Sequence, residues 1–272
     1  MPWRPVNPTH AIERVRFIVQ FRQPISEKLN EQLKRAAGRH SNETRMVGPA
    51  PMQSVRFGIQ VLPDGQQQVL SPVTEGHGWQ YVRSSSVNQP LEVLGVQGNQ
   101  IVYETTEYRR WNTFMQRFSK VAAEAIEVAN QSLDTEIVAL EYFDRFYFEG
   151  DREDADPRLL LSDIEKFLKP DAASGRTMWH LHRGWFEKAA DGDILINQNF
   201  DVTEAIPPGG TSTVRTISIF TKAELRSSNH VVDGVPMADL LNLLHDSTGS
   251  YFKSALEPSM LASVGMYEDD KA

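Results

Sequence analysis

One stretch, residues 101–148, constrains this chain most, because it joins a clear amphipathic helix pattern directly to a long apolar strand pattern. From Trp111 to Leu133 the apolar residues recur every three or four positions, which predicts a helix with one face against a core. The sequence then becomes β-branched and aromatic between Ile137 and Phe148, and Gly150 follows, which predicts a strand largely buried on both faces. This stretch is the scaffold around which the chain is arranged, and by itself it identifies no reaction or partner.

The segments around this scaffold follow the same order in each half of the chain. The first half reads as a strand, a helix capped by Ser26, a polar loop, short strands with glycine and aspartate turns, and the central helix. The second half reads as a strand, a helix that begins at Pro157 and ends at Lys169-Pro170, three strands and a long helix. The expected strands are 11–21, 53–62, 67–73, 78–84, 90–96, 101–108, 137–148, 177–187, 194–205 and 212–222, the expected helices are 26–39, 111–133, 157–169 and 237–256, and a polar loop is expected at 38–51.

This order predicts an α+β fold built from two pseudo-repeats of strand, helix, antiparallel strands and long helix. We expect a first half at 1–133, a second half at 134–258 and a polar C-terminal tail at 259–272, with the halves fused into one globular unit. The long helices should pack on one side of the sheets, with the aromatic residues at the start of the central helix facing them. By topology alone this arrangement resembles the double β-α-β4-α repeat of the TATA-binding-protein type, and a fold analogy of this kind carries no function.

The composition excludes several classes of function. The chain has 36 acidic and 28 basic side chains, a formal net charge of −8, which disfavours general nucleic-acid binding because it repels phosphate backbones. It has no cysteine, which excludes disulfides, thiolate catalysis and zinc sites with cysteine ligands. We find no run of about 18 apolar residues and no apolar stretch at the start, so we expect neither a membrane span nor a signal peptide, and a soluble, bacterial, cytoplasmic protein.

Three short motifs carry a family resemblance. The run Tyr108-x-x-Trp111-x-x-Phe114, the strand segment that includes Glu141 and Asp144, and Leu244-His245 with Phe252 resemble a sporadically distributed prokaryotic family of uncharacterised proteins of about this length. The strand of that family usually reads like Arg-Tyr-x-Asn-Arg, and Glu141 and Asp144 stand here where the family has Arg and Asn. The family has no established activity to carry over. A scattered distribution is typical of defence or toxin-associated loci, and this implies a similar setting for the chain.

Asp144 is a carboxylate at a strand position where the pattern predicts an apolar side chain. Alternation along the predicted strand places it on one face with apolar residues, so we expect it to be buried and either met by hydrogen-bond donors or raised in pKa. A perturbed carboxylate is a candidate for general acid or base catalysis, and the alternative is a structural anchor, with Glu141 and Arg145 pairing on the opposite face. The apolar residues on the Asp144 face are Val138, Leu140, Tyr142, Phe146 and Phe148.

The other candidates are histidines and an acidic loop. His180 and His182 lie two apart on a predicted strand, a spacing that can direct two imidazoles to one metal, although such a site needs further ligands. The loop at 151–156 has enough carboxylates for calcium but lacks the glycine and glutamate of an EF-hand, and Asp156 before Pro157 suits a helix cap. His245, at the boundary of the last helix's apolar face, reads as a capped or partly buried histidine rather than a catalytic one.

These observations favour a non-enzymatic protein-interaction or regulatory component of a larger bacterial assembly, associated with a defence or toxin locus. A complete scaffold without a catalytic constellation is the reason, and a protein partner is expected. The alternative is a metal- or carboxylate-assisted hydrolase that acts on a small molecule or nucleotide through Asp144 or through His180 and His182. No cofactor and no confident catalytic or metal-binding residue is predicted, and the oligomeric state stays open.

Overall fold

The fold is dominated by one large antiparallel sheet. The computed structural model of the chain describes residues 2–56, 59–61, 67–69, 73–168, 177–189, 192–226 and 235–266. Ten strands form the sheet in the order β10-β11-β12-β9-β2-β8-β7-β6-β3, and β1 pairs with β9 outside this path. The strands are β1 (Trp3–Pro5), β2 (Ile12–Phe21), β3 (Val47–Arg56), β6 (Val73–Ser84), β7 (Pro90–Gln97), β8 (Gln100–Thr105), β9 (Thr135–Phe148), β10 (Trp179–Ala189), β11 (Gly192–Ala205) and β12 (Val214–Arg226), while β4 (Ile59–Val61) and β5 (Gln67–Val69) pair separately.

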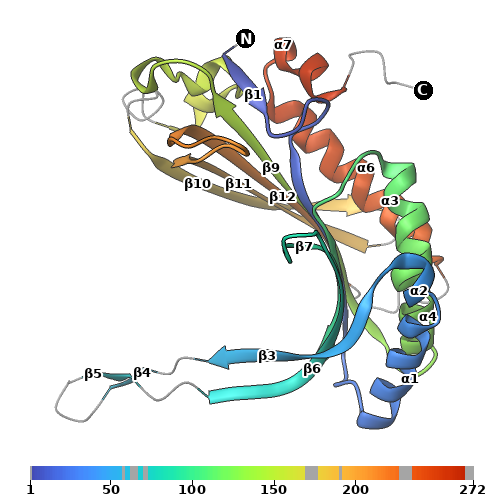
Figure 1. Cartoon of the computed structure of the whole chain (residues 1–272). Helices are drawn as coiled ribbons and strands as arrows, with labels where there is room; N and C mark the ends of the chain where they lie inside the picture. The colour runs from blue at the N-terminus through green and yellow to red at the C-terminus, as the bar shows by residue number, and fades with distance from the viewer. Residues whose placement is uncertain are drawn as a thin grey trace.

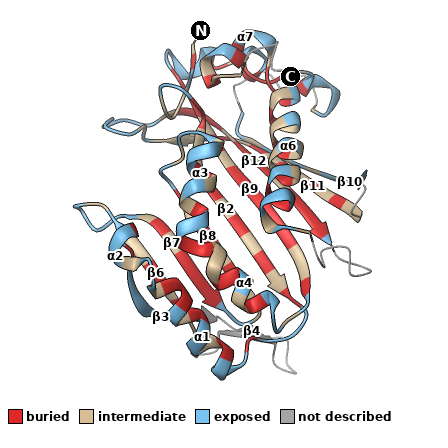
Figure 2. Ribbon diagram, turned by 90° about the vertical axis from the view of Figure 1, so that its right-hand side faces the viewer, coloured by how far each residue is buried: buried red, intermediate tan, exposed pale blue. Residues whose placement is uncertain are grey.

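The helices cover one face of this sheet and leave the other face open, as Figure 1 and Figure 2 show. The helices are α1 (Glu27–Gly38), α2 (Ser41–Thr44), α3 (Trp111–Phe118), α4 (Glu124–Asn130), α6 (Met237–Ala255) and α7 (Pro258–Leu261). A π-helical turn at Ser119–Ala123 joins α3 to α4, so the predicted central helix runs from Trp111 to Asn130. The α+β class is confirmed, and both long helices lie on the same side of the sheet. None of the helices in the described ranges is long and apolar enough to cross a membrane.

Local sequence explains where these helices start and what they bury. The side chain of Ser26 accepts a hydrogen bond from the backbone N–H of Leu29 at 3.3 Å, which caps α1 as predicted. Phe114 and Phe118 face the sheet and are each 3% exposed, while Trp111 is half-buried. The apolar face of the central helix therefore packs where its periodicity predicts.

The core on the helix side consists of two hydrophobic clusters. The first lies under α1, α3, α4 and the N-terminal half of α6, and the second lies under the C-terminal half of α6, β1 and α7. Strand β9 supplies both, because Leu140 belongs to the first cluster and Phe146 to the second. The inward face of β9 is buried as the alternation predicts, and Asp144 stands between the two clusters.

Two expectations were wrong, one for the segment that follows β9 and one for the segment that precedes β3. The segment from Pro157 forms 3-10 turns at Pro157–Leu159 and Ile164–Lys166 in place of an α-helix, because Asp163 adopts a left-handed conformation with φ 57°. Leu160, Leu161 and Ile164 are still buried. The apolar spacing therefore predicted correctly which side chains pack in the core, although it predicted the wrong backbone conformation. The expected loop at 38–51 contains α2 and the start of β3. The expected helix end at 169–170 lies outside the described residues.

The C-terminal segment also differs from the predicted polar tail. Residues from Pro258 onward form α7 and a 3-10 turn at Ala262–Val264, and they bury Met260, Leu261 and Val264 in the second cluster. The apolar residues of this short run are too few to show a helical period, which is why the sequence pattern missed them. The last described residue of the segment is Met266.

A buried carboxylate ties the first half of the sheet to the helices. The side chain of Glu92 on β7 has 0% of its surface exposed. It accepts hydrogen bonds from Arg117 of α3 at 2.8 Å, Arg83 of β6 at 2.9 Å and the Tyr103 hydroxyl of β8 at 2.6 Å. These donors hold the pKa of Glu92 below its ordinary value even though burial alone would raise it. Every oxygen of this carboxylate is therefore satisfied, as a buried charge requires.

We expect Glu92→Gln to destabilise the fold by about 2–4 kcal/mol, because it removes the charge that faces two guanidinium groups in a buried network. Urea unfolding followed by circular dichroism measures the change. Glu107→Gln is the matched control, since Glu107 binds the same Arg83 at 2.6 Å but is 49% exposed. Its loss should be below about 1 kcal/mol. Equal losses in the two variants would contradict the role given to burial.

Candidate functional site

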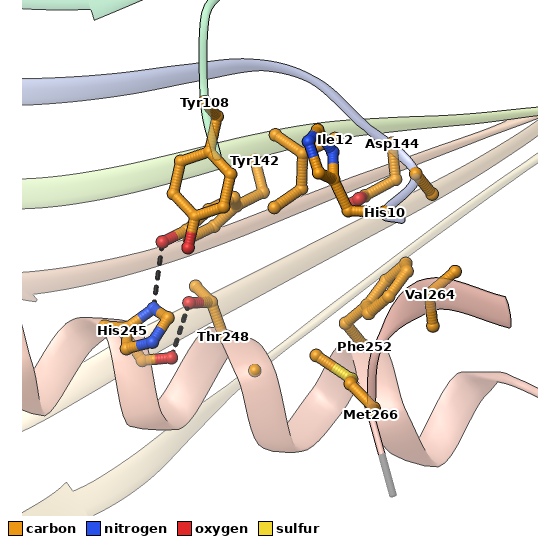
Figure 3. A pocket seen from close by; sticks show the side chains of 12 residues that line it. His10, Ile12, Tyr108, Tyr142, Asp144, His245, Thr248, Phe252, Val264 and Met266 are labelled. Carbon is orange, nitrogen blue, oxygen red and sulfur yellow. Dashed lines mark hydrogen bonds between the residues drawn. The ribbon is translucent and has the colours of Figure 1, made fainter. Parts of the chain in front are cut away.

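A small cavity lies between β9 and α6, where the two hydrophobic clusters meet. Its volume is about 70 Å³, which is room for a few water molecules or a small organic group. Figure 3 shows its walls, which come from the chain before β2, from the loop after β8, from β9, from α6 and from the turn after α7. The lining residues are His10, Ala11, Ile12, Tyr108, Tyr142, Asp144, His245, Thr248, Gly249, Phe252, Val264 and Met266.

Asp144 is the chemically unusual member of this wall. It is 2% exposed, and its Oδ1 has no hydrogen-bond partner within the described part of the chain. Burial raises the pKa of the Asp144 carboxyl well above its ordinary value of 3.8, which favours the neutral acid. The predicted burial is confirmed, whereas the described residues place no hydrogen-bond donor on Oδ1 of Asp144.

A break in strand pairing lies beside Asp144. Ile12 of β2 pairs with Asp144, and the register then shifts before Arg14 pairs with Phe143. A bulge of this kind redirects side chains locally and bends the strand. Ile12 therefore reaches the cavity, while Arg14 lies over the Phe143 ring on the opposite face at 3.8 Å from its centroid.

Tyr142 and His245 connect the sheet to α6 beside the carboxyl. The Tyr142 hydroxyl and Nδ1 of His245 are 2.9 Å apart, and burial lowers the pKa of His245, which favours the neutral imidazole. The indole of Trp111 stacks on the imidazole, with ring centroids 4.0 Å apart and 6° between the planes. The indole N–H donates to Oδ1 of Asn242 at 2.8 Å, so both rings are held in place.

Tyr108 and Thr248 complete the polar part of the wall. Burial raises the pKa of Tyr108 to about 12, and the nearby Asp144 carboxyl adds to this rise while Tyr142 hydrogen bonding opposes it. The Thr248 hydroxyl donates to the carbonyl of Leu244 at 2.9 Å, so it is engaged with its own helix. The cavity thus offers neutral hydroxyl, imidazole and carboxyl groups, a set that can bind a ligand or transfer a proton, with no activated nucleophile among them.

Gly249 keeps one side of the cavity open. A Cβ at this position of α6 would meet no atom within 4 Å. A glycine inside a helix costs about 1 kcal/mol relative to alanine, so an empty space beside it is retained at a cost in stability. Oδ1 of Asp144 and this glycine therefore both border open space on the sheet side of α6.

The predicted histidine pair lies elsewhere, on the helix-free face at the edge strand β10. Nδ1 of His180 is 2.5 Å from Oδ1 of Asp201, and His182 bonds the Asn199 side chain on the neighbouring strand. Within the described ranges, no group of three or more His, Cys, Asp and Glu side chains is arranged to hold a metal ion. The two histidines are therefore cross-strand partners of polar β11 residues, far from the Asp144 cavity in the sheet order.

Glu141 belongs to a charge ladder on the same helix-free face. Its carboxylate lies 3.5 Å from Nη1 of Arg16 and 4.0 Å from Nζ of Lys222. Burial raises the pKa of Glu141, and these two cations oppose the rise. The expected pairing with Arg145 does not occur, because Arg145 binds Glu13 at 3.0 Å.

The acidic loop at 151–156 is a capping segment in the structure. The carboxylate of Asp156 accepts the backbone N–H of Arg158 at 2.9 Å and pairs with the Arg158 guanidinium. This caps the 3-10 turn that begins at Pro157, as expected for an aspartate before proline. The loop makes no contribution to the cavity wall.

The sequence pattern pointed to several residues of the Asp144 cavity separately, but it did not predict that they meet in one place. Tyr108 and Trp111 belong to the motif of the family resemblance, and His245 was predicted as a partly buried helix histidine. Nothing in the sequence joined them, because the elements that carry them meet only after the sheet forms. His10 was not singled out, and no periodic signal marks it in the irregular segment before β2.

We expect Asp144→Asn to stabilise the protein increasingly as the pH rises. In the wild type the folded pKa lies above the unfolded value, so the stability that protonation provides is complete below about pH 3.8 and is lost as the pH rises towards the folded pKa. Asparagine does not titrate, so the difference in unfolding free energy should grow by up to about 1.4 kcal/mol per pH unit within this window. Urea melts at pH 4.5, 6 and 7.5 measure it.

Asp246→Asn is the control for this pH series, because Asp246 is an exposed carboxylate beside His245 on the same helix. The pH dependence of Asp144→Asn is compared with that of this control. A constant difference between Asp144→Asn and the wild type across the series would show that the Asp144 carboxyl is ionised and solvated.

We expect Gly249→Ala to raise the unfolding free energy by about 0.5–1 kcal/mol, because alanine favours the helix and the new methyl group enters open space. Gly38→Ala at the end of α1 is the matched control. There a Cβ would lie 2.9 Å from the Tyr81 hydroxyl, so the same substitution should destabilise. Thermal melts compare the two, and a loss of stability in Gly249→Ala would show that the space beside α6 is filled.

Comparison of the chain with protein-family models and with curated proteins finds no match. The family resemblance seen at Tyr108–Phe114 and in the central strand therefore stays a prediction. The chemistry of the Asp144 cavity and of the helix-free face supplies the basis for a function.

Proposed function

We propose that this chain is a non-enzymatic regulatory component that binds a small ligand in the Asp144 cavity and a protein partner on the helix-free face of its sheet. We place it within a larger bacterial assembly, associated with a defence or toxin locus. The observation that carries the proposal is the buried, unpartnered carboxyl of Asp144 in a cavity that Gly249 leaves open. Buried polar groups without partners are rare in native proteins and often mark functional positions.

Energetics favour a ligand over a purely structural role for Asp144. Burying a polar group without a hydrogen bond costs about 1–3 kcal/mol, and an apolar residue at this position would avoid that cost. The Glu92 network shows that the same sheet can satisfy a buried carboxylate fully when its role is structural. A ligand that donates a hydrogen bond to Oδ1 of Asp144 would recover this free energy.

The helix-free face supports the partner half of the proposal. Six charges of alternating sign run across β8, β2, β9 and β12 as Glu104, Arg16, Glu141, Lys222, Glu224 and Arg226. Beside them the rings of Phe143 and Phe220 lie 4.9 Å apart. Figure 1 shows this face curving away from the helices into a concave surface. Balanced charges flanked by aromatic rings suit a protein surface better than a phosphate backbone.

Strand β9 joins the two halves of the proposal. Asp144 reaches the cavity, while its neighbour Phe143 lies on the helix-free face. Because alternate residues of a strand point to opposite faces, a shift of β9 on ligand binding moves the partner surface as well. This arrangement supports a regulatory role in which the ligand alters partner binding.

We also propose that the two halves of the chain are pseudo-repeats. Strands β2 and β9, the first long strand of each half, pair at the centre of the sheet, and each also pairs with the last strand of its own half, β8 or β12. This symmetry of pairing supports two pseudo-repeats, although the second half has 3-10 turns where the first has α1. The ligand cavity then lies beside the junction of the two halves.

A carboxylate-assisted hydrolase is the second candidate function. A neutral Asp144 near the hydrogen-bonded pair of Tyr142 and His245 favours it, because a carboxyl of raised pKa can act as a general acid. Turnover of a panel of esters, phosphodiesters and nucleotides by the wild type, lost in Asp144→Asn, would support this candidate over the non-enzymatic one.

We expect a photo-crosslinking amino acid at Phe143 or Phe220 to capture the same protein in the native host, because both positions share the concave face. The control position is Ser119, which is exposed on the helix side. The captured protein is then purified separately and its affinity for the wild type measured by calorimetry. Lys222→Glu, which breaks the charge ladder at its centre, should weaken this affinity about tenfold, equivalent to about 1.4 kcal/mol.

Two results would contradict the partner surface. One is equal capture at Ser119 and Phe143, and the other is an affinity that Lys222→Glu leaves unchanged. The circular dichroism spectrum and melting temperature of Lys222→Glu show whether the variant keeps its fold.

A further inference from the structure

We infer that the Asp144 cavity binds a small organic cation, an ammonium group carried on a fragment of a few carbon atoms. This inference rests on the proposed ligand-binding function and names the chemical class of the ligand. It follows from three properties of the cavity, which are the identity of its charged group, the aromatic character of its walls and its size.

The first property is charge. Among the described side chains that line the cavity, Asp144 is the only acidic one, and none is a lysine or an arginine. An incoming ammonium supplies both the positive charge and the N–H donors that Oδ1 lacks. Removing the cationic partner of a buried ion pair is strongly destabilising, so a buried Asp144 carboxylate would hold such an ammonium firmly.

The second property is the wall around the carboxyl. The rings of Tyr108, Tyr142 and Phe252 line the cavity, and those of His10 and His245 join them. Aromatic faces attract cations through their quadrupole, by about 0.5–2 kcal/mol for each ring when water is excluded. Figure 3 shows Tyr108, Tyr142 and Asp144 on the sheet side of the space and His245 and Phe252 on the α6 side.

The third property is size. A volume of about 70 Å³ admits a fragment of a few non-hydrogen atoms and excludes a nucleotide or a peptide. Apart from Thr248, whose hydroxyl bonds its own helix, the remaining lining has no polar side chain, and Ile12, Val264 and Met266 are among its members. A short alkyl chain on the ammonium group would therefore contact apolar atoms on the side away from Asp144.

The surrounding titratable and charged groups fit this ligand. Burial lowers the pKa of both His10 and His245, so both imidazoles favour the neutral state. Tyr108 and Tyr142 stay protonated, since burial raises the pKa of each hydroxyl. Two charged groups outside the lining also affect these pKa values. The positive charge of Arg110 lowers the pKa of His10 and of Tyr108. The negative charge of Asp246 raises the pKa of Tyr142 and of His245. Asp144 is thus the single group within the cavity whose ionisation a cation would induce.

Binding of a cation and binding of a neutral acceptor have opposite pH dependence. An ammonium ligand stabilises the ionised carboxyl, so its affinity should rise with pH from the region of the ordinary carboxyl pKa upward. A neutral ligand that accepts a hydrogen bond from the protonated Asp144 should lose affinity over the same range. The sign of the pH dependence therefore separates the two classes without knowledge of the natural ligand.

The test is calorimetry of the full chain with defined probes. The probes are methylammonium, ethylammonium and trimethylammonium, with the neutral acetamide and ethanol and the anion acetate for comparison, each at pH 5, 6.5 and 8. Tryptophan fluorescence provides a second readout, because the Trp111 indole stacks on His245 at the cavity wall. The chain has 5 tryptophans, so a change that disappears in Trp111→Phe is the one assigned to Trp111. We expect an ammonium probe to bind at least tenfold more tightly than its neutral counterpart, with affinity rising from pH 5 to pH 8.

Three variants localise the binding. Asp144→Asn keeps the shape of the side chain and should lose at least tenfold in ammonium affinity together with its pH dependence. Gly249→Leu fills the open side of the cavity and should weaken every probe. Asp246→Asn removes a nearby carboxylate outside the cavity and should change ammonium affinity by less than threefold. Circular dichroism and melting temperature confirm that each variant is folded before its affinity is measured.

The outcomes separate the two levels of the inference. Neutral probes that bind at least as tightly as ammonium, with affinity falling as the pH rises, would overturn the cation while leaving a ligand site at Asp144. Binding that Asp144→Asn and Gly249→Leu leave unchanged would overturn the cavity as the place of binding. If no probe of any class binds the folded wild type at millimolar concentration, both the cation and the ligand-binding function are wrong.

Discussion

The pairing of β9 with β2 on one side and β12 on the other is the interaction on which the rest of the structure depends. It turns strands from both halves of the chain into one sheet and buries β9 at its centre. Both hydrophobic clusters on the helix side use residues of this strand, so α3, α6 and the terminal segments are placed by it. The cavity lies on the helix side of β9 and the charge ladder on its helix-free side, because alternate residues of this strand point to opposite faces.

Two buried carboxylates show how differently this sheet treats the same functional group. Glu92 meets two arginines and a tyrosine and keeps a lowered pKa, which is the arrangement expected of a structural ion. Asp144 has an unpartnered oxygen and a raised pKa in a cavity with aromatic walls. The fold thus satisfies one buried carboxylate fully, and the oxygen that it leaves without a partner at Asp144 is the observation from which we propose ligand binding.

Sequence periodicity predicted the parts of the fold that depend on neighbours in the chain. The burial of Asp144 followed from strict alternation with apolar residues in β9, and the packing of Phe114 and Phe118 followed from a helical repeat. The segment after Pro157 was predicted incorrectly because apolar spacing predicts burial without fixing the backbone, and the left-handed conformation of Asp163 is incompatible with a continuous α-helix. The stack of Trp111 on His245 could not be predicted, since it depends on how α3 and α6 lie against the sheet.

The walls of the cavity come from widely separated parts of the chain. His10 lies near the first strand and Met266 at the end of the described chain, while Tyr142 and Asp144 come from its middle. Contacts between residues so distant in sequence close late in folding, because the intervening chain must be ordered first. During synthesis, therefore, the first half can acquire its helices and local strand pairs while the cavity is still incomplete. The cavity is complete only when α6 has packed against the sheet, so a chain that stops before α6 lacks it.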